Sequence, residues 1–298
     1  MIPKTFILGT RGSQLALRQS EMVRDALLRH FPTLQIELRI IKTKGDKLQH
    51  LSLDASGDKG LFTGALEEAL RAGEIDFAVH SLKDLPVDPA PGTRIAAYLP
   101  RAVTHDTLIG PMPLEALPEG ALIGTSSRRR AYQIALHYPH LHTEPIRGNV
   151  ETRMGKVDAG LFDATLLAEA GLTRLDMKDV TRYPISEEII VPAPGQAAIA
   201  VQTRDEDGEL QTLLQQIHDA KTEREVTIER SLLKRLGGGC ALPLGCVCHI
   251  EGEMAELRVF YANASGTEHY LATHRTSLSD IDPLLSQLIE HLQHITTA

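Results

Sequence analysis

The sequence predicts an α/β fold made of two related α/β halves and a small C-terminal α+β domain. Strand-like and helix-like segments alternate up to residue 99, and this pattern restarts after Pro100. From Thr222 onward the order of helix-like and strand-like segments is different. Such alternation is typical of a sheet with helices on both faces. The length of 298 residues also exceeds one ordinary domain.

The first half begins with an apolar segment that predicts a buried strand. Strands are expected at 5–9, 34–42, 77–80 and 94–99, with helices at 14–29 and 61–72. Residues 43–60 contain several glycine breakers and no sustained period, which favours a long mobile loop. The order of these elements predicts a parallel or mixed sheet.

The rest of the chain repeats this pattern and then departs from it. Strands are expected at 121–124, 163–168 and 197–202, with a helix at 128–137. From Thr222 we expect a helix to Leu236, two or three strands to about His274, and a closing helix from Asp282. The turns at 9–13 and 124–127 each join a strand to a helix, and this weak internal similarity indicates two related halves.

Composition narrows the class of function. The formal charge of −8 argues against a protein that coats nucleic acid, and no apolar run approaches the roughly 20 residues that span a bilayer. The N-terminal residues lack the features of a signal peptide, so a cytoplasmic enzyme or binding protein is expected. Of the 31 cationic residues 21 are arginine, the side chain suited to bidentate capture of carboxylates and phosphates. A small polyanionic ligand is therefore expected.

Both strand-to-helix turns have the chemistry of anion sites. A helix N-terminus presents unpaired N–H groups and the positive end of the helix dipole. Arg11 lies in the first turn, and residues 128–130 are three consecutive arginines in the second. Three cations at a helix start are unfavourable unless an anion compensates them. Capped helices with solvated arginines remain the alternative.

The segment 79–86 places an amine and a carboxylate directly after a buried strand. Lys83 and Asp84 would then lie at the carboxyl edge of the sheet, where α/β proteins bind ligands. Asp84 could act as an acid or base, or stabilise a cationic intermediate. An exposed turn before a proline is the alternative.

Three glycines precede Cys240, which would leave its thiol unobstructed as a nucleophile or attachment site. A metal site formed with Cys246, Cys248 and His249 is the alternative, but the spacing lacks the usual C-x2-C pair. We expect no metal, and we expect Cys246 and Cys248 to be buried strand thiols.

Taken in order, the motifs are His80-Ser-Leu-Lys-Asp-Leu-Pro86, Gly124-Thr-Ser-Ser-Arg-Arg-Arg130, Arg147-Gly-Asn149, Pro194-Gly-Gln196 and Gly238-Gly-Cys240. They closely resemble the porphobilinogen deaminase (hydroxymethylbilane synthase) family of tetrapyrrole and heme biosynthesis. The resemblance implies two type II periplasmic-binding-protein-like domains plus a small C-terminal α+β domain. The implied boundaries are 1–99 with 198–217 for domain 1, 100–197 for domain 2 and 218–298 for domain 3.

The resemblance also implies the chemistry. Cys240 would hold a dipyrromethane cofactor through a thioether, and four porphobilinogen molecules would be added to it with loss of ammonia. Hydrolysis would release linear hydroxymethylbilane and leave the cofactor attached. Asp84 and Lys83 would be catalytic. The enzyme would be a cytoplasmic monomer that binds neither nucleic acid nor membrane.

The family's other binding residues map onto matching positions of this sequence. The implied cofactor-binding residues are Cys240, Arg11, Ser13, Lys83, Asp84, Ser127, Arg129, Arg130, Gly148 and Asn149. The implied substrate-binding residues are Arg11, Gln19, Lys59, Ser81, Arg147, Arg153, Arg174 and Gln196.

The chain departs from the family pattern at Ala55, where a lysine is common, and at Gly64-Ala65, where Lys-Glu is common. The first departure removes a possible contact to a cofactor carboxylate. A cytosolic anion-binding or sensor protein built on the same two halves is the alternative of a different class.

Overall fold

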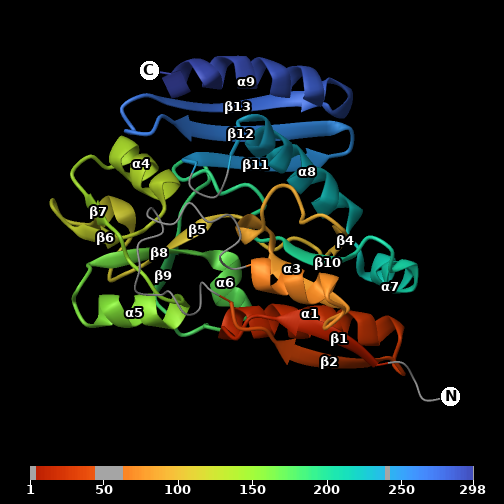
Figure 1. Ribbon diagram of the computed structural model, residues 1–298. Helices are drawn as coiled ribbons and strands as arrows, with labels where there is room; N and C mark the ends of the chain where they lie inside the picture. The colour runs from red at the N-terminus through yellow and green to blue at the C-terminus, as the bar shows by residue number, and fades with distance from the viewer. Residues whose placement is uncertain (1–4, 44–62, 239–241, 298) are drawn as a thin grey trace. The chain divides into compact units, whose positions relative to one another are not determined.

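The computed structural model describes residues 5–43, 63–238 and 242–297 (Figure 1). Cys240, Lys59, Ala55 and nearly all of the loop expected at 43–60 lie outside these residues. The chain divides into two compact units. Unit 1 comprises Met1–Ala102 and Ala197–Glu223, and unit 2 comprises Val103–Gln196 and Arg224–Ala298.

Unit 1 is built on a mixed five-stranded sheet with the order β2-β1-β3-β10-β4. The strands are β1 (Thr5–Thr10), β2 (Gln35–Ile40), β3 (Phe77–Ser81), β4 (Thr93–Tyr98) and β10 (Ile199–Arg204). β1 pairs in parallel with β2 and β3, whereas β10 pairs antiparallel with β3 and β4. The predicted mixed sheet is therefore confirmed.

Both faces of this sheet are apolar, because apolar side chains point alternately to one face and then to the other along the strands. The helices are α1 (Gln14–His30), α3 (Gly64–Arg71) and α7 (Gly208–Leu214), with short 3-10 turns η2 (Leu82–Asp84) and η4 (Gln215–Ile217). Phe77 and Val79 of β3 pack with residues of α1 and α7, whereas Ala78 packs with residues of α3. Successive strand residues point to opposite faces, so helices on both sides are needed to cover the sheet.

Unit 2 contains a second five-stranded sheet, with the order β7-β6-β8-β5-β9. Its strands are β5 (Asp106–Ile109), β6 (Leu122–Gly124), β7 (His142–Glu144), β8 (Ala164–Ala168) and β9 (Arg182–Pro184). The helices are α4 (Arg128–His137), α5 (Val150–Asp158) and α6 (Glu169–Arg174), with the 3-10 turn η3 (Leu114–Ala116). β6 is parallel to β7 and β8, whereas β5 is antiparallel to β8 and β9.

The two sheets share one topology. In each, three parallel strands are followed by an antiparallel fourth strand and then an edge strand. The antiparallel strands, β10 and β5, each follow a segment in which the chain crosses from one sheet to the other. The expected pair of related α/β halves is therefore confirmed.

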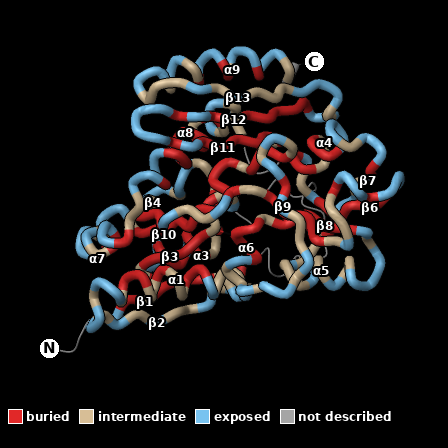
Figure 2. The backbone as a smooth tube through the Cα atoms, turned by 180° about the vertical axis from the view of Figure 1, so that it is seen from behind, coloured by how far each residue is buried: buried red, intermediate tan, exposed pale blue. Residues whose placement is uncertain are grey.

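The C-terminal part is α+β, as predicted. It contains α8 (Ala220–Arg235), β11 (Leu244–Glu251), β12 (Met254–Ala262), β13 (His269–Ser277), the turn η5 (Leu278–Asp280) and α9 (Ile281–Thr297). One face of this antiparallel sheet packs against apolar residues of α8 and α9. Figure 2 shows β11 and β12 buried beneath the exposed outer side of α9.

Most predicted elements are present, with ends shifted by a few residues. The sequence did not predict β5, β7, β9, α5, α6 or α7, which are all short. β7 and β9 each contain three residues, mostly polar, so neither strand shows a period that could be detected. Among the described residues, no helix is long and apolar enough to cross a membrane.

Candidate active site

A hollow in unit 1 gathers five of the predicted site residues. It lies where β1 passes into α1 and where β3 passes into η2. Its lining residues are Arg11, Ser13, Leu15, Ala16, Gln19, Thr63, Val79, His80, Ser81 and Asp84. β1 and β3 are parallel neighbours, so their carboxyl ends meet at one edge of the sheet, as expected for a ligand site in an α/β fold.

The start of α1 provides an anion-binding edge to this hollow. Ser13 is the N-cap, and its hydroxyl accepts the Ala16 N–H at 3.3 Å. The first turn of α1 contains no acidic residue, so no carboxylate within that turn offsets the positive end of the helix dipole. Arg11 adds a guanidinium to the same hollow.

A hydrogen bond between Gln19 and Ser81 ties α1 to the end of β3. The Gln19 Nε2 lies 2.8 Å from the Ser81 Oγ, and Gln19 is almost fully buried. This contact fixes the two predicted substrate-binding side chains relative to each other.

Asp84 lies on a turn whose backbone is anchored by buried leucines. Leu82 and Leu85 are buried, and the Leu82 N–H donates to the Ala198 carbonyl at 3.0 Å. Between them Lys83 is half-buried and Asp84 is exposed at the hollow. The turn thus holds the Asp84 carboxylate at the hollow.

His80 lines the same hollow and was not predicted as a site residue. It is 5% exposed, and its Nε2 makes no hydrogen bond with any described residue. Burial lowers the pKa of His80 to about 4; the nearby polar side chain of Gln202 opposes this shift, and the positive charge of Arg11 adds to it. The imidazole is therefore neutral at physiological pH.

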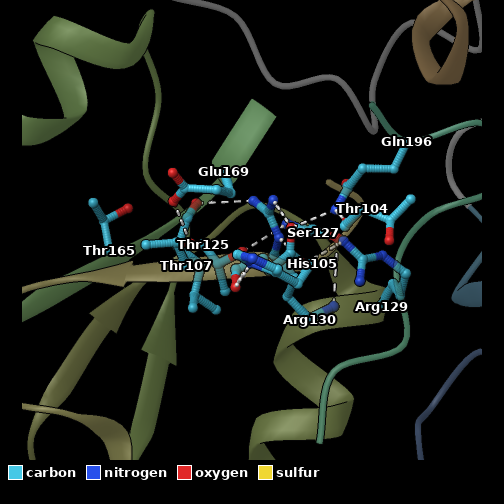
Figure 3. A network of polar contacts seen from close by, with 12 residues as sticks. Thr104, His105, Thr107, Thr125, Ser127, Arg129, Arg130, Thr165, Glu169 and Gln196 are labelled. Carbon is cyan, nitrogen blue, oxygen red and sulfur yellow. Dashed lines mark hydrogen bonds and ion pairs between the residues drawn. The ribbon is translucent and has the colours of Figure 1, made fainter. Parts of the chain in front are cut away.

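In unit 2, the predicted Arg129 and Arg130 meet a buried carboxylate that the sequence did not reveal (Figure 3). Asp106 accepts Arg129 Nη2 at 2.8 Å and Arg130 Nη2 at 2.7 Å. It also accepts the Gln196 amide at 2.8 Å. All four side chains are buried.

These contacts alter the interpretation of the arginine run. The anion that compensates Arg129 and Arg130 at the start of α4 is an internal one, Asp106, so the dipole argument alone does not require a ligand at these residues. Arg128 is exposed. Ser127 is the N-cap of α4 and accepts the Arg130 N–H at 3.4 Å.

The start of α5 holds another predicted group. Asn149 is the N-cap, and its Oδ1 accepts the Thr152 N–H at 2.8 Å. Gly148 has a φ of 115°, and its carbonyl accepts the Arg153 Nε at 2.9 Å. The Arg147 carbonyl accepts Lys156 Nζ at 3.1 Å. Together these bonds fix the backbone of the Arg-Gly-Asn turn.

Arg174 ends α6 and is partly buried. Burial lowers the pKa of its guanidinium to about 10, so the side chain remains cationic at neutral pH. A desolvated cation of this kind interacts more strongly with a carboxylate than a fully hydrated one does.

The predicted thiols of β11 are where the sequence suggested. Cys246 and Cys248 are fully buried thiols, packed on the face that meets α8 and α9. Cys240 and Lys59 lie outside the described residues, so their predicted roles stay predictions.

A second buried carboxylate, Glu229 of α8, was also missed. It accepts the Gly195 N–H at 2.7 Å and the Cys248 N–H at 2.8 Å, and it is fully buried. The bond to Gly195 fixes the Pro-Gly-Gln turn that carries Gln196. Both Glu229 and Asp106 meet partners distant in sequence, so no local pattern could have indicated them.

The residues of the hollow fit a polycarboxylate cofactor. A guanidinium and a helix N-terminus without acidic residues offer donors to an anion, and the His80 Nε2 is a further buried polar atom without a partner among the described residues. Fold and site together define the class: an α/β protein of two related halves whose candidate sites contain cationic side chains.

Comparison with known proteins identifies the family. Residues 6–212 match the family model "Porphobilinogen deaminase, dipyromethane cofactor binding domain", and residues 223–281 match "Porphobilinogen deaminase, C-terminal domain". The chain belongs to the porphobilinogen deaminase family. Its members are transferases with hydroxymethylbilane synthase activity and a dipyrromethane cofactor.

Relatives match along nearly the whole chain. Porphobilinogen deaminase from Roseiflexus sp. (strain RS-1) is 45% identical over 257 residues, covering 86% of this chain and 85% of the relative. The enzyme from Nitrobacter winogradskyi is 42% identical over 277 residues, covering 92% and 88%. The enzyme from Nostoc sp. (strain PCC 7120) is 40% identical over 295 residues, covering 97% and 91%.

Proposed function

We propose that the chain joins four porphobilinogen molecules in sequence onto a dipyrromethane primer attached to Cys240, and then releases linear hydroxymethylbilane by hydrolysis. One ammonia is lost at each addition. The observation that carries this proposal is the convergence of five family-matched side chains on one hollow, in a chain that belongs to this family.

The start of α1 would bind ligand carboxylates. Each pyrrole ring of the substrate carries an acetate and a propionate, which can accept hydrogen bonds from Arg11 and from backbone N–H groups beside Ser13. Charge-assisted hydrogen bonds of this kind are about twice as strong as neutral ones. Gln19 and Ser81, already bonded to each other at 2.8 Å, would supply further polar contacts with little loss of side-chain freedom.

Asp84 would stabilise the positive charge that develops when ammonia leaves the substrate. Its carboxylate can accept pyrrole N–H groups, and its rigid turn keeps it in place while the charge forms. Lys83 would bind a carboxylate beside the reacting ring. When bound, the dipyrromethane supplies the pyrrole carbon to which the first substrate unit is joined.

The cationic residues of unit 2 would bind other carboxylates of the growing chain. Arg129 and Arg130 share the carboxylate of Asp106, and the surplus of positive charge favours a ligand anion nearby. Ser127 would bind the cofactor, and Gln196 would bind the substrate. The cofactor contacts proposed at the start of α5 are Gly148 and Asn149, and the substrate contacts are Arg147, Arg153 and Arg174, with Lys59 added from outside the described residues.

We also propose that the chain has three domains with the boundaries predicted from the sequence, that it is a monomer, and that it is cytoplasmic. The C-terminal sheet has its own apolar core with α8 and α9, which supports a separate third domain. Sedimentation of the purified chain measures the oligomeric state, and a concentration-independent dimer would contradict the monomer.

The test of the proposed chemistry is Asp84→Asn, which keeps the shape and removes the charge. We expect turnover to fall at least about a hundredfold, because electrostatic stabilisation in a shielded site contributes several kcal/mol. The matched control is Asp88→Asn, an exposed aspartate of the same loop that does not line the hollow, and its turnover should stay within about twofold. The mass of each variant reports whether the cofactor is present.

A loss below about fivefold in Asp84→Asn would make Asp84 a structural turn residue. A wild-type chain that binds porphobilinogen without forming hydroxymethylbilane would instead support the anion-binding or sensor alternative.

A further inference from the structure

His80 occupies an unusual position for a buried polar side chain. It is the fourth residue of β3, so it shares the sheet face of Ala78 rather than the apolar face of Phe77 and Val79. It is 5% exposed and lines the hollow that contains Asp84. Its Nε2 is buried without a hydrogen-bond partner among the described residues. Buried polar atoms are nearly always paired, so this nitrogen calls for an explanation.

The charged groups around His80 define what its partner could be. Arg11 and Asp84 line the same hollow, and Arg11 is close enough for its charge to act on the imidazole. On the side of α3 and β10, the Glu67 carboxylate accepts the Gln202 amide at 3.3 Å. A neutral ring therefore faces the hollow beside a cation, with its Nε2 free to act as a donor.

We infer that His80 contacts the ligand directly, its Nε2–H donating a hydrogen bond to the same carboxylate that Arg11 binds. This inference rests on the proposed function of the hollow. A carboxylate only accepts hydrogen bonds, so its second partner must be a donor. A neutral imidazole supplies that donor without placing a second positive charge beside Arg11. The alternative, in which an unprotonated Nε2 accepts a pyrrole N–H, requires the opposite tautomer.

This arrangement makes His80 a specificity residue. A ligand without a carboxylate at this position leaves a buried N–H unpaired, and a site built to hydrogen-bond a substrate group discriminates strongly against analogues that lack it. Carboxylate binding also places an anion beside the imidazole, which favours its protonated form. Loading of the site is thus expected to raise the pKa of His80.

Histidine ¹⁵N NMR of the full chain tests the tautomer. Spectra of the cofactor-loaded wild type and of the cofactor-free Cys240→Ser variant are compared, and the His80 signals are assigned by their loss in His80→Gln. In the loaded protein we expect a protonated Nε2 whose proton resonance shifts downfield, whereas His274 of the C-terminal sheet, which does not line the hollow, stays unchanged. An unprotonated Nε2, or a His80 signal identical in the two proteins, would overturn the inference.

Variants test the contribution to binding. His80→Phe keeps the ring volume and loses the donor, so KM for porphobilinogen should rise about tenfold or more. His80→Gln retains a side-chain N–H and should stay within about threefold, as should the control His274→Gln. A KM within twofold of wild type in His80→Phe would contradict the inference, and the NMR experiment on the wild type does not depend on that variant folding.

The two possible failures can be told apart. If the wild type forms hydroxymethylbilane and carries the cofactor while the His80 experiments are negative, only the inference fails. If the wild type forms no product and carries no added mass, the proposed function fails.

Discussion

Replacing Asp106 with asparagine removes the carboxylate that two buried guanidinium groups share. Asp106 is fully buried, and the hydrogen bonds that it accepts include those from Arg129 Nη2 at 2.8 Å, Arg130 Nε at 3.0 Å, Arg130 Nη2 at 2.7 Å and Gln196 Nε2 at 2.8 Å. An asparagine carries one acceptor oxygen and no charge, so at least two of these donors lose their partner. The arginines cannot release their charge, because the guanidinium stays protonated in proteins.

The expected loss of unfolding free energy follows from the burial of the Asp106 ion pairs. Removing one partner of a buried ion pair destabilises by about 3–5 kcal/mol, because it leaves an uncompensated buried charge. We expect Asp106→Asn to lose about that much unfolding free energy in the transition of unit 2, measured by urea denaturation followed by circular dichroism. Activity should fall in addition, since both arginines lose the group that fixes their orientation.

The control for this experiment is an exposed ion pair in the same unit. Lys178 and Asp176 lie 2.8 Å apart with 78% and 75% of their side chains exposed. Asp176→Asn should cost less than about 1 kcal/mol. If Asp106→Asn cost no more than this control, the network would not stabilise unit 2, and the internal compensation of Arg129 and Arg130 would be refuted.

Two further predictions concern pH and backbone strain. The pKa of His80 falls from 6.5 to about 4 on folding. Between these pH values the unfolded chain binds a proton at His80 that the folded chain does not. The contribution of His80 to the free energy of unfolding is therefore complete above pH 6.5 and declines by about 3 kcal/mol towards pH 4. His80→Gln should reduce that decline in urea titrations at several pH values, and equal slopes would disprove the assignment. Gly148→Ala should lower the free energy of unfolding by about 1–3 kcal/mol and raise KM for porphobilinogen. The reason is that φ of residue 148 is 115° and a Cβ there would lie 2.5 Å from Thr152. The control Gly155→Ala, with open space around its Cβ, should be neutral or slightly stabilising, and identical melting temperatures for the two variants would argue against strain at residue 148.

Local sequence patterns predicted those helices and strands that depend on residues near one another in the sequence. The helix 128–137 was placed correctly after a short polar turn that follows a strand, and β3 was placed from its contiguous apolar residues. The carboxyl-edge position of Asp84 followed from that strand, and Arg11, Ser13, Gln19 and Ser81 line the same hollow.

The remaining site features depend on contacts that are distant in sequence. Asp106 begins a four-residue strand and meets arginines 23 and 24 positions away, whereas Gln196 is 90 positions away. His80 looked like one polar residue in a motif, and only burial together with the missing partner of Nε2 makes it notable. No spacing rule reports either property.

The most direct test of the account is the intact mass of the chain, purified after expression in a host that makes porphobilinogen. The wild type should show a mass excess of two pyrrole units, located on Cys240 by peptide mapping, whereas Cys240→Ser should show the unmodified mass and no turnover. An unmodified wild-type chain that still forms hydroxymethylbilane, or a Cys240→Ser variant that keeps both the added mass and its activity, would contradict it.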